Sequence, residues 1–157
     1  MDGRRGFGNG RLLPAGPLRE PLDRLGRVDW LIRNGASESE GGEWSPDLVQ
    51  GLRNPVQEMT LVPTGYYRLG DELWHDVDDP PEGFSQGVTA LAGMGNPERF
   101  FDTLRHLGVA VRTECTFPDH HGYKPEDFEN LETPVLMTEK DAVKCAALAP
   151  DAWALRV

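Results

Sequence analysis

The residues best suited to chemistry lie in one short loop, Phe117-Pro118-Asp119-His120-His121. A carboxylate next to an imidazole can orient the ring or stabilise its charged form, so Asp119 and His120 can act together as a general base. Two adjacent histidines and an aspartate can also bind a metal, although neighbouring side chains point in different directions and no further His or Cys lies at ligand spacing. Three interpretations stay open for this loop: general-base catalysis, a structural or surface role, and a metal site.

A phosphate-binding loop is missing from the sequence. The motif Gly-x-x-x-x-Gly-Lys-Ser/Thr needs a lysine directly after a glycine, and no glycine in this chain is followed by lysine. Gly93 and Gly95 follow an apolar run and resemble a dinucleotide-binding turn, but Glu98 stands at the third glycine position, where its charge would oppose pyrophosphate. A tight strand-to-helix turn is the better interpretation of this segment.

The formal net charge of −10 is unevenly distributed along the chain. Residues 1–33 hold seven arginines against four acids, and the remaining residues hold nine basic side chains against 22 acidic ones. The acidic body argues against a nucleic-acid binder, because phosphate would repel it. The basic start can face phosphate or anionic lipid, and its glycines at 6–10 can form an anion nest with the flanking arginines Arg4, Arg5 and Arg11. A solvated, flexible end explains the same pattern.

Cysteine use and hydropathy place the chain in the cytoplasm. Cys115 and Cys145 are too few and too far apart for a disulfide scaffold or a metal knuckle, which indicates free thiols in a reducing compartment. No apolar run is long enough to span a membrane, and the first residues lack the apolar stretch of a signal peptide.

Alternating elements after residue 87 must position the histidine-containing loop. Apolar runs predict strands at 88–93, 109–113, 134–138 and 153–157. Helices are predicted from an Asn96 cap to Gly108, from Pro125 to Leu131, and from a capping box of Thr138 and Asp141 to Leu148. This alternation is typical of right-handed β-α-β crossovers, so the predicted fold class is α/β, with a parallel sheet and flanking helices.

Residues before 88 are less regular. A short helix is expected after Pro21 and a strand at 28–33, followed by a polar loop over 36–55. Two strands hinged at Pro63 within 58–69 predict a β-ribbon, and the acid-rich stretch 71–82 predicts a solvated connector.

Four blocks of the sequence, in this order, resemble the tetraacyldisaccharide 4'-kinases, the lipid A kinases of Gram-negative bacteria. The blocks are residues 2–21, 92–101, 117–121 and 137–145. The first is similar to the stretch that follows the family's central Asp-Asp-Gly-Phe-Gln segment. Each block is weak alone, but four in the family's order are specific, and the resemblance spans nearly the whole chain, with 36–85 the most divergent part.

The resemblance implies a P-loop-like kinase core and a smaller C-terminal α/β lobe, joined by a β-ribbon. The predicted domains are therefore a remnant of the kinase core with a polar loop (1–57), a β-ribbon with an acidic connector (58–87), and the C-terminal lobe (88–157). The family transfers the γ-phosphate of ATP to the 4'-hydroxyl of a tetraacyldisaccharide 1-phosphate in lipid A, and hence lipopolysaccharide, biosynthesis. It uses Mg²⁺ and works at the cytoplasmic face of the inner membrane.

Matching the family's motifs assigns roles to individual residues. The catalytic positions are His120, which the family pairs with an aspartate that would precede residue 1, and Asp119. Cleft or substrate positions are Arg4, Arg5, Asn9, Arg19, Glu20 and His121. Because phosphoryl transfer depends on a P-loop lysine and Mg²⁺, ATP and Mg²⁺ are expected to belong to the complete enzyme, and neither cofactor nor metal is expected to be held by this chain.

The resemblance therefore predicts a fragment that is inactive alone. The implied partners are the acylated disaccharide phosphate, a missing N-terminal half, and the membrane surface through peripheral contact, with no nucleic acid. One alternative is a glycolipid-binding or regulatory lobe without catalysis. Another is a small α/β hydrolase that uses Asp119 and His120.

Overall fold

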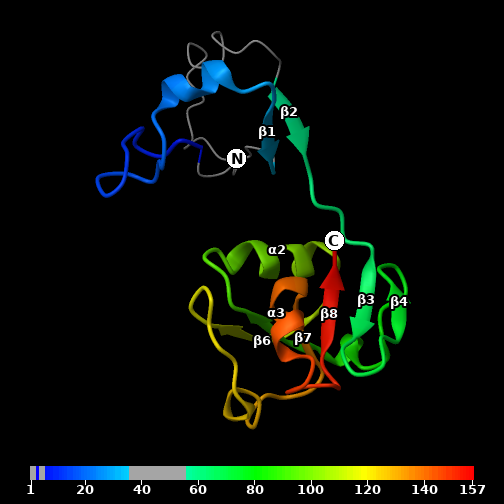
Figure 1. Cartoon of the computed structure of the whole chain (residues 1–157). Helices are drawn as coiled ribbons and strands as arrows, with labels where there is room; N and C mark the ends of the chain where they lie inside the picture. Colours follow the sequence, from blue (N-terminus) through cyan, green and yellow to red (C-terminus); the bar gives the residue numbers. More distant parts are fainter. Residues whose placement is uncertain (1–2, 4–5, 36–55) are drawn as a thin grey trace. The chain divides into compact units, whose positions relative to one another are not determined.

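The computed structural model describes residue 3 and residues 6–35 and 56–157, which fall into two units. The first unit is Met1–Leu61 and the second is Val62–Val157 (Figure 1). The polar loop predicted at 36–55 lies outside the described residues. Among the described residues, no helix has the length and apolar character needed to cross a membrane.

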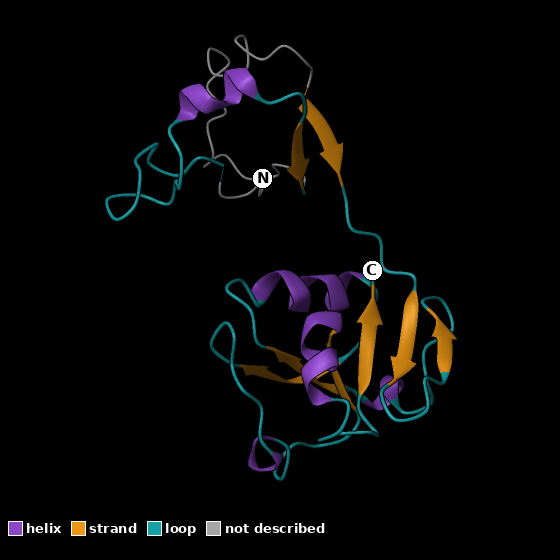
Figure 2. Cartoon of the chain, viewed as in Figure 1, coloured by secondary structure: helices purple, strands orange, loops and turns teal. Residues whose placement is uncertain are grey.

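The second unit is built on a six-stranded mixed sheet in the order β4-β3-β8-β7-β5-β6 (Figure 2). Strands β6, β5, β7 and β8 run parallel, whereas β3 and β4 are antiparallel at one edge. The strands are β3 (Gly65–Arg68), β4 (Trp74–Asp76), β5 (Val88–Ala92), β6 (Val111–Thr116), β7 (Val135–Thr138) and β8 (Trp153–Arg156). The helices are η2 (Phe84–Gln86), α2 (Glu98–His106), η3 (Pro125–Asp127) and α3 (Glu139–Cys145). The predicted α/β class with flanking helices is confirmed.

Strands β5, β7 and β8 are buried on both faces over most of their length, which explains why they are largely apolar, whereas β6 lies at the edge of the sheet and is mostly exposed and polar. Because successive strand side chains point to opposite faces, Ala90 and Leu136 pack with α2, whereas Leu91 and Met137 pack with α3. Helix α2 contributes its apolar stripe of Phe100, Phe101 and Leu104 to the first cluster, and α3 contributes Ala142 and Cys145 to the second. Helices α2 and α3 therefore pack on opposite faces of the sheet.

Several predicted boundaries are corrected by the structure. Strand β6 begins at Val111 rather than 109, because the Val109 N–H still bonds to Leu104 at the end of α2. Helix α2 has Pro97 at its N-cap and no side-chain cap, so the expected capping by Asn96 is not formed. The segment expected as a helix from 125 to 131 is a single 3₁₀ turn, η3, and α3 ends at Cys145 instead of Leu148.

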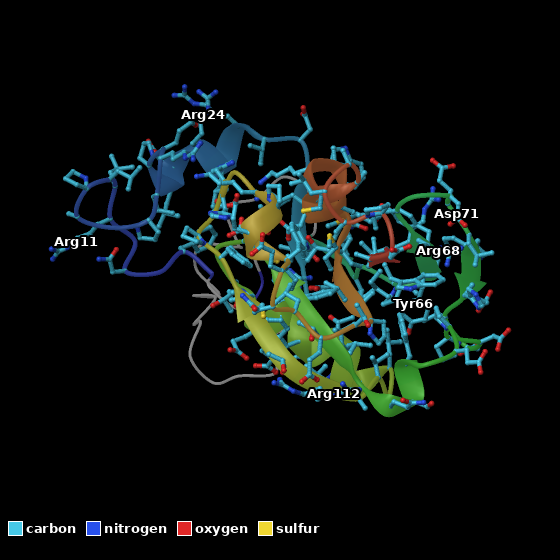
Figure 3. All side chains as sticks on the ribbon, turned by 90° about the horizontal axis from the view of Figure 1, so that it is seen from below. Arg11, Arg24, Tyr66, Arg68, Asp71 and Arg112 are labelled. Carbon is cyan, nitrogen blue, oxygen red and sulfur yellow. The ribbon has the colours of Figure 1, made fainter. Side chains whose placement is uncertain are left out.

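The β-ribbon expected within 58–69 is not formed, because only the end of β2 (Val56–Met59) and all of β3 are strand in this range and each pairs with another strand. β2 is parallel to β1 (Leu31–Asn34) in the first unit, and β3 lies between β4 and β8 in the second. The acidic segment after β3 is not a plain connector, because it contains β4. A hairpin joins the two strands: Arg68 donates from its backbone to Leu73 at 2.9 Å and from its side chain to Asp71 (Figure 3).

The first unit has little packing of its own in its described part. It consists of loop 6–21, the 3₁₀ helix η1 (Leu22–Arg27) and the pair β1–β2. None of the η1 residues is buried. The side chain of Trp30 is 63% exposed and that of Ile32 47%.

Candidate active site

The carboxyl ends of β5, β6 and β7 meet at one edge of the sheet. Ala92 lies opposite Thr116 of β6, and Leu91 lies opposite Met137 of β7. The chain leaves β5 through α2 toward β6 on one side, and it leaves β7 through α3 toward β8 on the other. In open α/β sheets, ligands bind outside the carboxyl ends of two neighbouring strands whose connections lead to opposite sides of the sheet. The residues that follow these strand ends are therefore the candidate site.

Residues 117–121, which we name the histidine loop, follow β6 at this edge. The Phe117 N–H donates to the Ala92 carbonyl at 3.0 Å, which ties the start of the loop to the end of β5. The His121 N–H donates to the Pro118 carbonyl at 3.0 Å and closes a turn. Within this turn His120 has a φ of 64°, a left-handed conformation that side-chain-bearing residues seldom adopt. The turn makes His120 the most projecting residue of the loop, and its side chain is 83% exposed.

Asp119 lies between a histidine and a lysine. Its Oδ1 accepts from Lys140 Nζ at 2.6 Å and from the His120 backbone N–H at 3.1 Å, and its Oδ2 lies 3.5 Å from His120 Nε2. The hydrogen bond from Lys140, followed by the charge of His120, lowers the pKa of Asp119 below its ordinary value. The carboxylate–imidazole pair expected from the sequence is thus present, with Lys140 as the closer partner of the carboxylate.

The neighbouring histidine is directed inward. His121 Nε2 lies 3.0 Å from Asp127 Oδ2, and its ring stacks on Phe117 with centroids 4.7 Å apart. This hydrogen bond, followed by one from the Lys124 N–H, lowers the pKa of Asp127. In the described part of the chain, no group of three or more His, Cys, Asp or Glu side chains is arranged to hold a metal. His121 therefore anchors the loop, and the exposed ring available to a ligand is that of His120.

Asp141 of α3 is completely buried next to the ends of β5 and β7. Its Oδ2 accepts from the Gly93 N–H at 2.9 Å and from the Thr138 hydroxyl at 2.7 Å, while its own N–H donates to Thr138 Oγ1 at 3.2 Å. The predicted capping box is thus half correct: Thr138 caps the helix, but the Asp141 carboxyl bonds to the end of β5 instead of to the Thr138 backbone.

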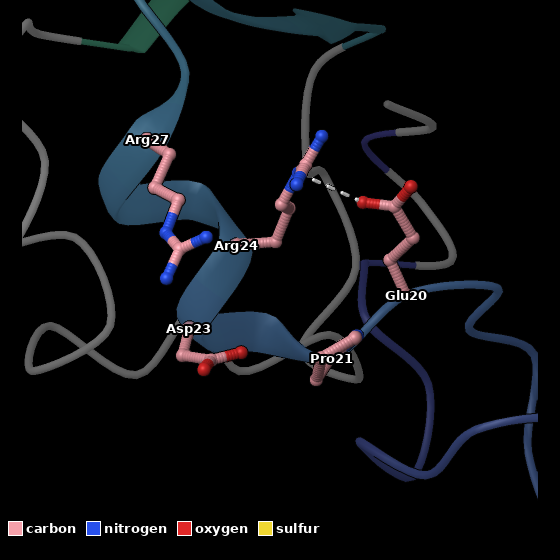
Figure 4. Close-up of a pocket in the computed structure, with 5 residues that line it drawn as sticks. All are labelled: Glu20, Pro21, Asp23, Arg24 and Arg27. Atoms are coloured by element: carbon pink, nitrogen blue, oxygen red, sulfur yellow. Dashed lines mark ion pairs between the residues drawn. The ribbon is translucent and has the colours of Figure 1, made fainter.

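The other predicted site residues lie in the first unit. Asn9 closes its own loop, donating to the Ala15 carbonyl at 2.9 Å and accepting from the Arg11 N–H at 3.1 Å. Glu20 pairs with Arg24 at 3.1 Å beside an open pocket of about 220 Å³, whose lining residues are Glu20, Pro21, Asp23, Arg24 and Arg27 (Figure 4). Arg19 is exposed, and Arg4 and Arg5 lie outside the described residues.

Sequence reasoning missed three residues of the site. Lys140, Asp127 and Tyr123 are not among the residues that the sequence assigns to the site. The available signal was the sheet edge itself, because the segments that follow β5, β6 and β7 must come together there. Which charged side chains then meet depends on loop conformations that sequence spacing does not specify.

Comparison with known proteins gives a consistent match. A family model described as Tetraacyldisaccharide-1-P 4'-kinase matches residues 1–157. A protein named Tetraacyldisaccharide 4'-kinase from Stutzerimonas stutzeri is 45% identical over 154 residues, covering 98% of this chain and 41% of its own length. The protein of that name from Legionella pneumophila strain Corby is 41% identical over 153 residues, covering 96% of this chain and 41% of its own length.

A solved structure supports the same relationship. LpxK from Aquifex aeolicus, described as an "apo" form in complex with ATP, matches with a TM-score of 0.58 and 27% identity. The match covers 94% of this chain and 42% of the LpxK chain. This chain therefore spans about two fifths of the length of the relatives that it matches.

Proposed function

Because the chain belongs to the tetraacyldisaccharide-1-phosphate 4'-kinase family, we propose that it supplies the histidine-bearing lobe of a lipid A kinase. The reaction would transfer the γ-phosphate of ATP to the 4'-hydroxyl of a tetraacyldisaccharide 1-phosphate. The observation that best supports this role is the exposed His120, held out by a left-handed turn at the carboxyl edge of a parallel sheet. Its site would lie at the cytoplasmic face of the inner membrane, in peripheral contact with it.

His120 is the group proposed to take the proton. As the sugar hydroxyl oxygen forms its bond to the γ-phosphorus, the bond from that phosphorus to the bridging oxygen breaks and ADP leaves, while the hydroxyl proton passes to an imidazole nitrogen of His120. The neighbouring Asp119 carboxylate, with its lowered pKa, would favour the charged imidazolium that results. Lys140 would keep Asp119 fixed and charged throughout. Asp119 is thus proposed to assist His120, and His121 to hold the loop in place.

ATP and Mg²⁺ are proposed to be held outside this chain. No glycine is followed by lysine anywhere in the sequence, and the described residues hold no metal-binding group of acids, histidines or cysteines. The N-terminus of α2 carries Glu98, which would repel a pyrophosphate. Nucleotide and metal are therefore assigned to the part of the family's polypeptide outside this span, and this chain alone is expected to be inactive.

An assay of the purified chain tests this assignment. The chain is incubated with ATP, Mg²⁺ and tetraacyldisaccharide 1-phosphate, and ATP binding is measured in parallel by calorimetry. We expect neither phosphorylated product nor heat of ATP binding. Phosphorylation by the chain alone would show that it holds a nucleotide site of another kind and would overturn the division of roles.

A second candidate is a lobe that binds the acylated disaccharide without catalysis. The favouring observation is that the second unit has its own two-sided core, although the chain covers two fifths of its relatives. Binding of the disaccharide phosphate to the chain, lost in His120→Ala or Arg19→Ala, would support this candidate. Absence of binding would leave the kinase lobe as the sole proposal.

A further inference from the structure

One buried carboxyl connects the segments that surround His120. Asp141 joins the start of α3 to the turn after β5, because its Oδ2 accepts from both Thr138 and Gly93. These two hydrogen bonds connect the end of β5 with the end of β7, the two neighbouring strands from which the chain continues to opposite sides of the sheet. In many α/β proteins a ligand binds at this point of the sheet, and here the buried Asp141 carboxyl ties together the chain segments on its two sides. Asp141 therefore lies beneath the proposed site instead of in it.

Tyr123 extends this connection to the histidine loop. A Cβ at Gly93 would lie 2.4 Å from the Tyr123 hydroxyl oxygen and 2.8 Å from Asp141 Oδ1, so both atoms border the space beside Gly93. The Tyr123 ring packs edge-on against His121, with centroids 5.0 Å apart, and against Phe117 at 5.3 Å. Burial, followed by the charge of Asp141, raises the pKa of Tyr123, which keeps its hydroxyl protonated.

We propose that Asp141 is the positioning residue of this site: it fixes the Gly93 turn and, through Tyr123, the histidine loop in the arrangement that presents His120 to substrate. It touches neither substrate nor the reacting atoms. The catalytic meaning of this role rests on the proposed function, whereas the ordering of the loop by Asp141 is a property of the chain itself.

The chemistry of the carboxyl explains why an amide would not replace it. The Gly93 N–H and the Thr138 hydroxyl converge on one oxygen as donors, and a carboxylate accepts at both of its oxygens. The amide of Asn has one oxygen and one NH₂ group, so with its oxygen on this donor pair its NH₂ would face Tyr123, whose hydroxyl oxygen would have to accept from it. The Tyr123 hydroxyl would have to turn its lone pairs toward residue 141, and we expect the Tyr123 ring, which contacts His121 and Phe117, to shift as it does so.

Nuclear magnetic resonance of the labelled chain tests the proposal through its four histidines. In Asp141→Asn, we expect the imidazole signals of His120 and His121 to shift or broaden and the Gly93 amide to lose protection from exchange. His75 on β4 and His106 at the end of α2 serve as internal references and are expected to stay unchanged. Thr89→Val is the matched control, because it alters a buried hydroxyl on β5 that has no hydrogen-bond partner among the described residues.

Unchanged His120 and His121 signals in folded Asp141→Asn would overturn the proposal, as would equal changes at all four histidines. Should that variant fail to fold, Tyr123→Phe decides the question, because it removes one hydroxyl and keeps the ring. We expect it to move the His121 signal, and an unmoved signal would contradict the pathway through Tyr123. Since this readout needs neither ATP nor substrate, a failure of the kinase proposal would appear separately, as missing activity with intact histidine signals.

Discussion

The two units of the chain differ in how much of their own structure they can stabilise. All buried apolar side chains of the described residues lie between Tyr66 and Leu155, in the second unit. The first unit instead has the parallel pair β1–β2, with exposed Trp30, Ile32 and Met59. Parallel strands are normally buried on both faces, and a two-stranded sheet is marginal on its own. The second unit thus has a core of its own, whereas the described part of the first unit has no buried apolar side chain.

This difference has a functional consequence. The histidine loop belongs to the unit with its own core, where Asp141 and the strand ends fix its geometry. The predicted cleft residues Asn9, Arg19 and Glu20 belong to the first unit, whose described residues include no buried apolar side chain. We therefore expect the histidine loop to be formed in this chain by itself.

The largest effect expected from this comparison is on stability. Phe101 is completely buried between α2 and the sheet, so Phe101→Ala should lower the free energy of unfolding by about 3–5 kcal/mol. Trp30 in the first unit is 63% exposed, so Trp30→Ala should change the free energy of unfolding by no more than about 0.5 kcal/mol. Urea denaturation followed by circular dichroism measures both. Similar losses in the two variants would mean that the first unit has a core of its own.

The stability of the second unit is also expected to depend on pH at acidic values. The hydrogen bond from Arg68 is the main cause that lowers the pKa of Asp71 from 3.8 to about 2. A carboxyl whose pKa is lower in the folded state adds stability above its unfolded pKa and loses it as the pH falls through the folded value. Stability should therefore fall between pH 3.8 and about 2.

Two variants isolate this contribution. Arg68→Met removes the partner and Asp71→Asn removes the titrating group, so both should reduce the fall in stability over that pH range. Denaturation curves at a series of pH values provide the measurement. A fall as steep as that of the wild type in both variants would show that other carboxylates, such as Asp119 and Asp127, account for it.

The smallest expected effect concerns the charge pair at the site. Lys140→Met should let the pKa of Asp119 return toward its ordinary value, because the hydrogen bond from Lys140 is the main cause that lowers it. Stability should hardly change, since exposed ion pairs contribute little. Carbon-13 resonances of the carboxyl report the pKa, and Lys124→Met serves as the matched control. An unchanged Asp119 pKa in Lys140→Met would mean that the pair does not persist in solution.

Patterns of apolar residues within a segment predicted most helices and strands of the second unit. They did not predict which strands pair when the partners lie far apart in the sequence. Apolar runs identified β5, β7 and β8, and the stripe of Phe100, Phe101 and Leu104 identified α2, because these signals lie within each segment. The ribbon within 58–69 was misassigned because the partner of a strand is not encoded in its own residues: β3 pairs with β8, which lies far along the chain.

The site shows the same limit. The Thr138 cap was predictable from a spacing of three residues, but the contact of Asp141 with Gly93 joins positions 48 residues apart. Likewise, the sequence singled out Asp119 and His120, while the contact of Asp119 with Lys140 spans 21 residues. Residues with reactive side chains could thus be recognised from the sequence by their type. The residues that they contact could be identified only from the fold.

The most direct test joins this chain to the part of the Stutzerimonas stutzeri relative outside the matched span. With ATP, Mg²⁺ and tetraacyldisaccharide 1-phosphate, we predict phosphorylation by the joined protein and by its His106→Ala control. His120→Ala should lower kcat by about 10²–10⁴-fold, the range expected for loss of a general base. Full activity of His120→Ala, or no activity in the folded joined protein, would contradict the proposal that this chain supplies the catalytic histidine of a lipid A kinase.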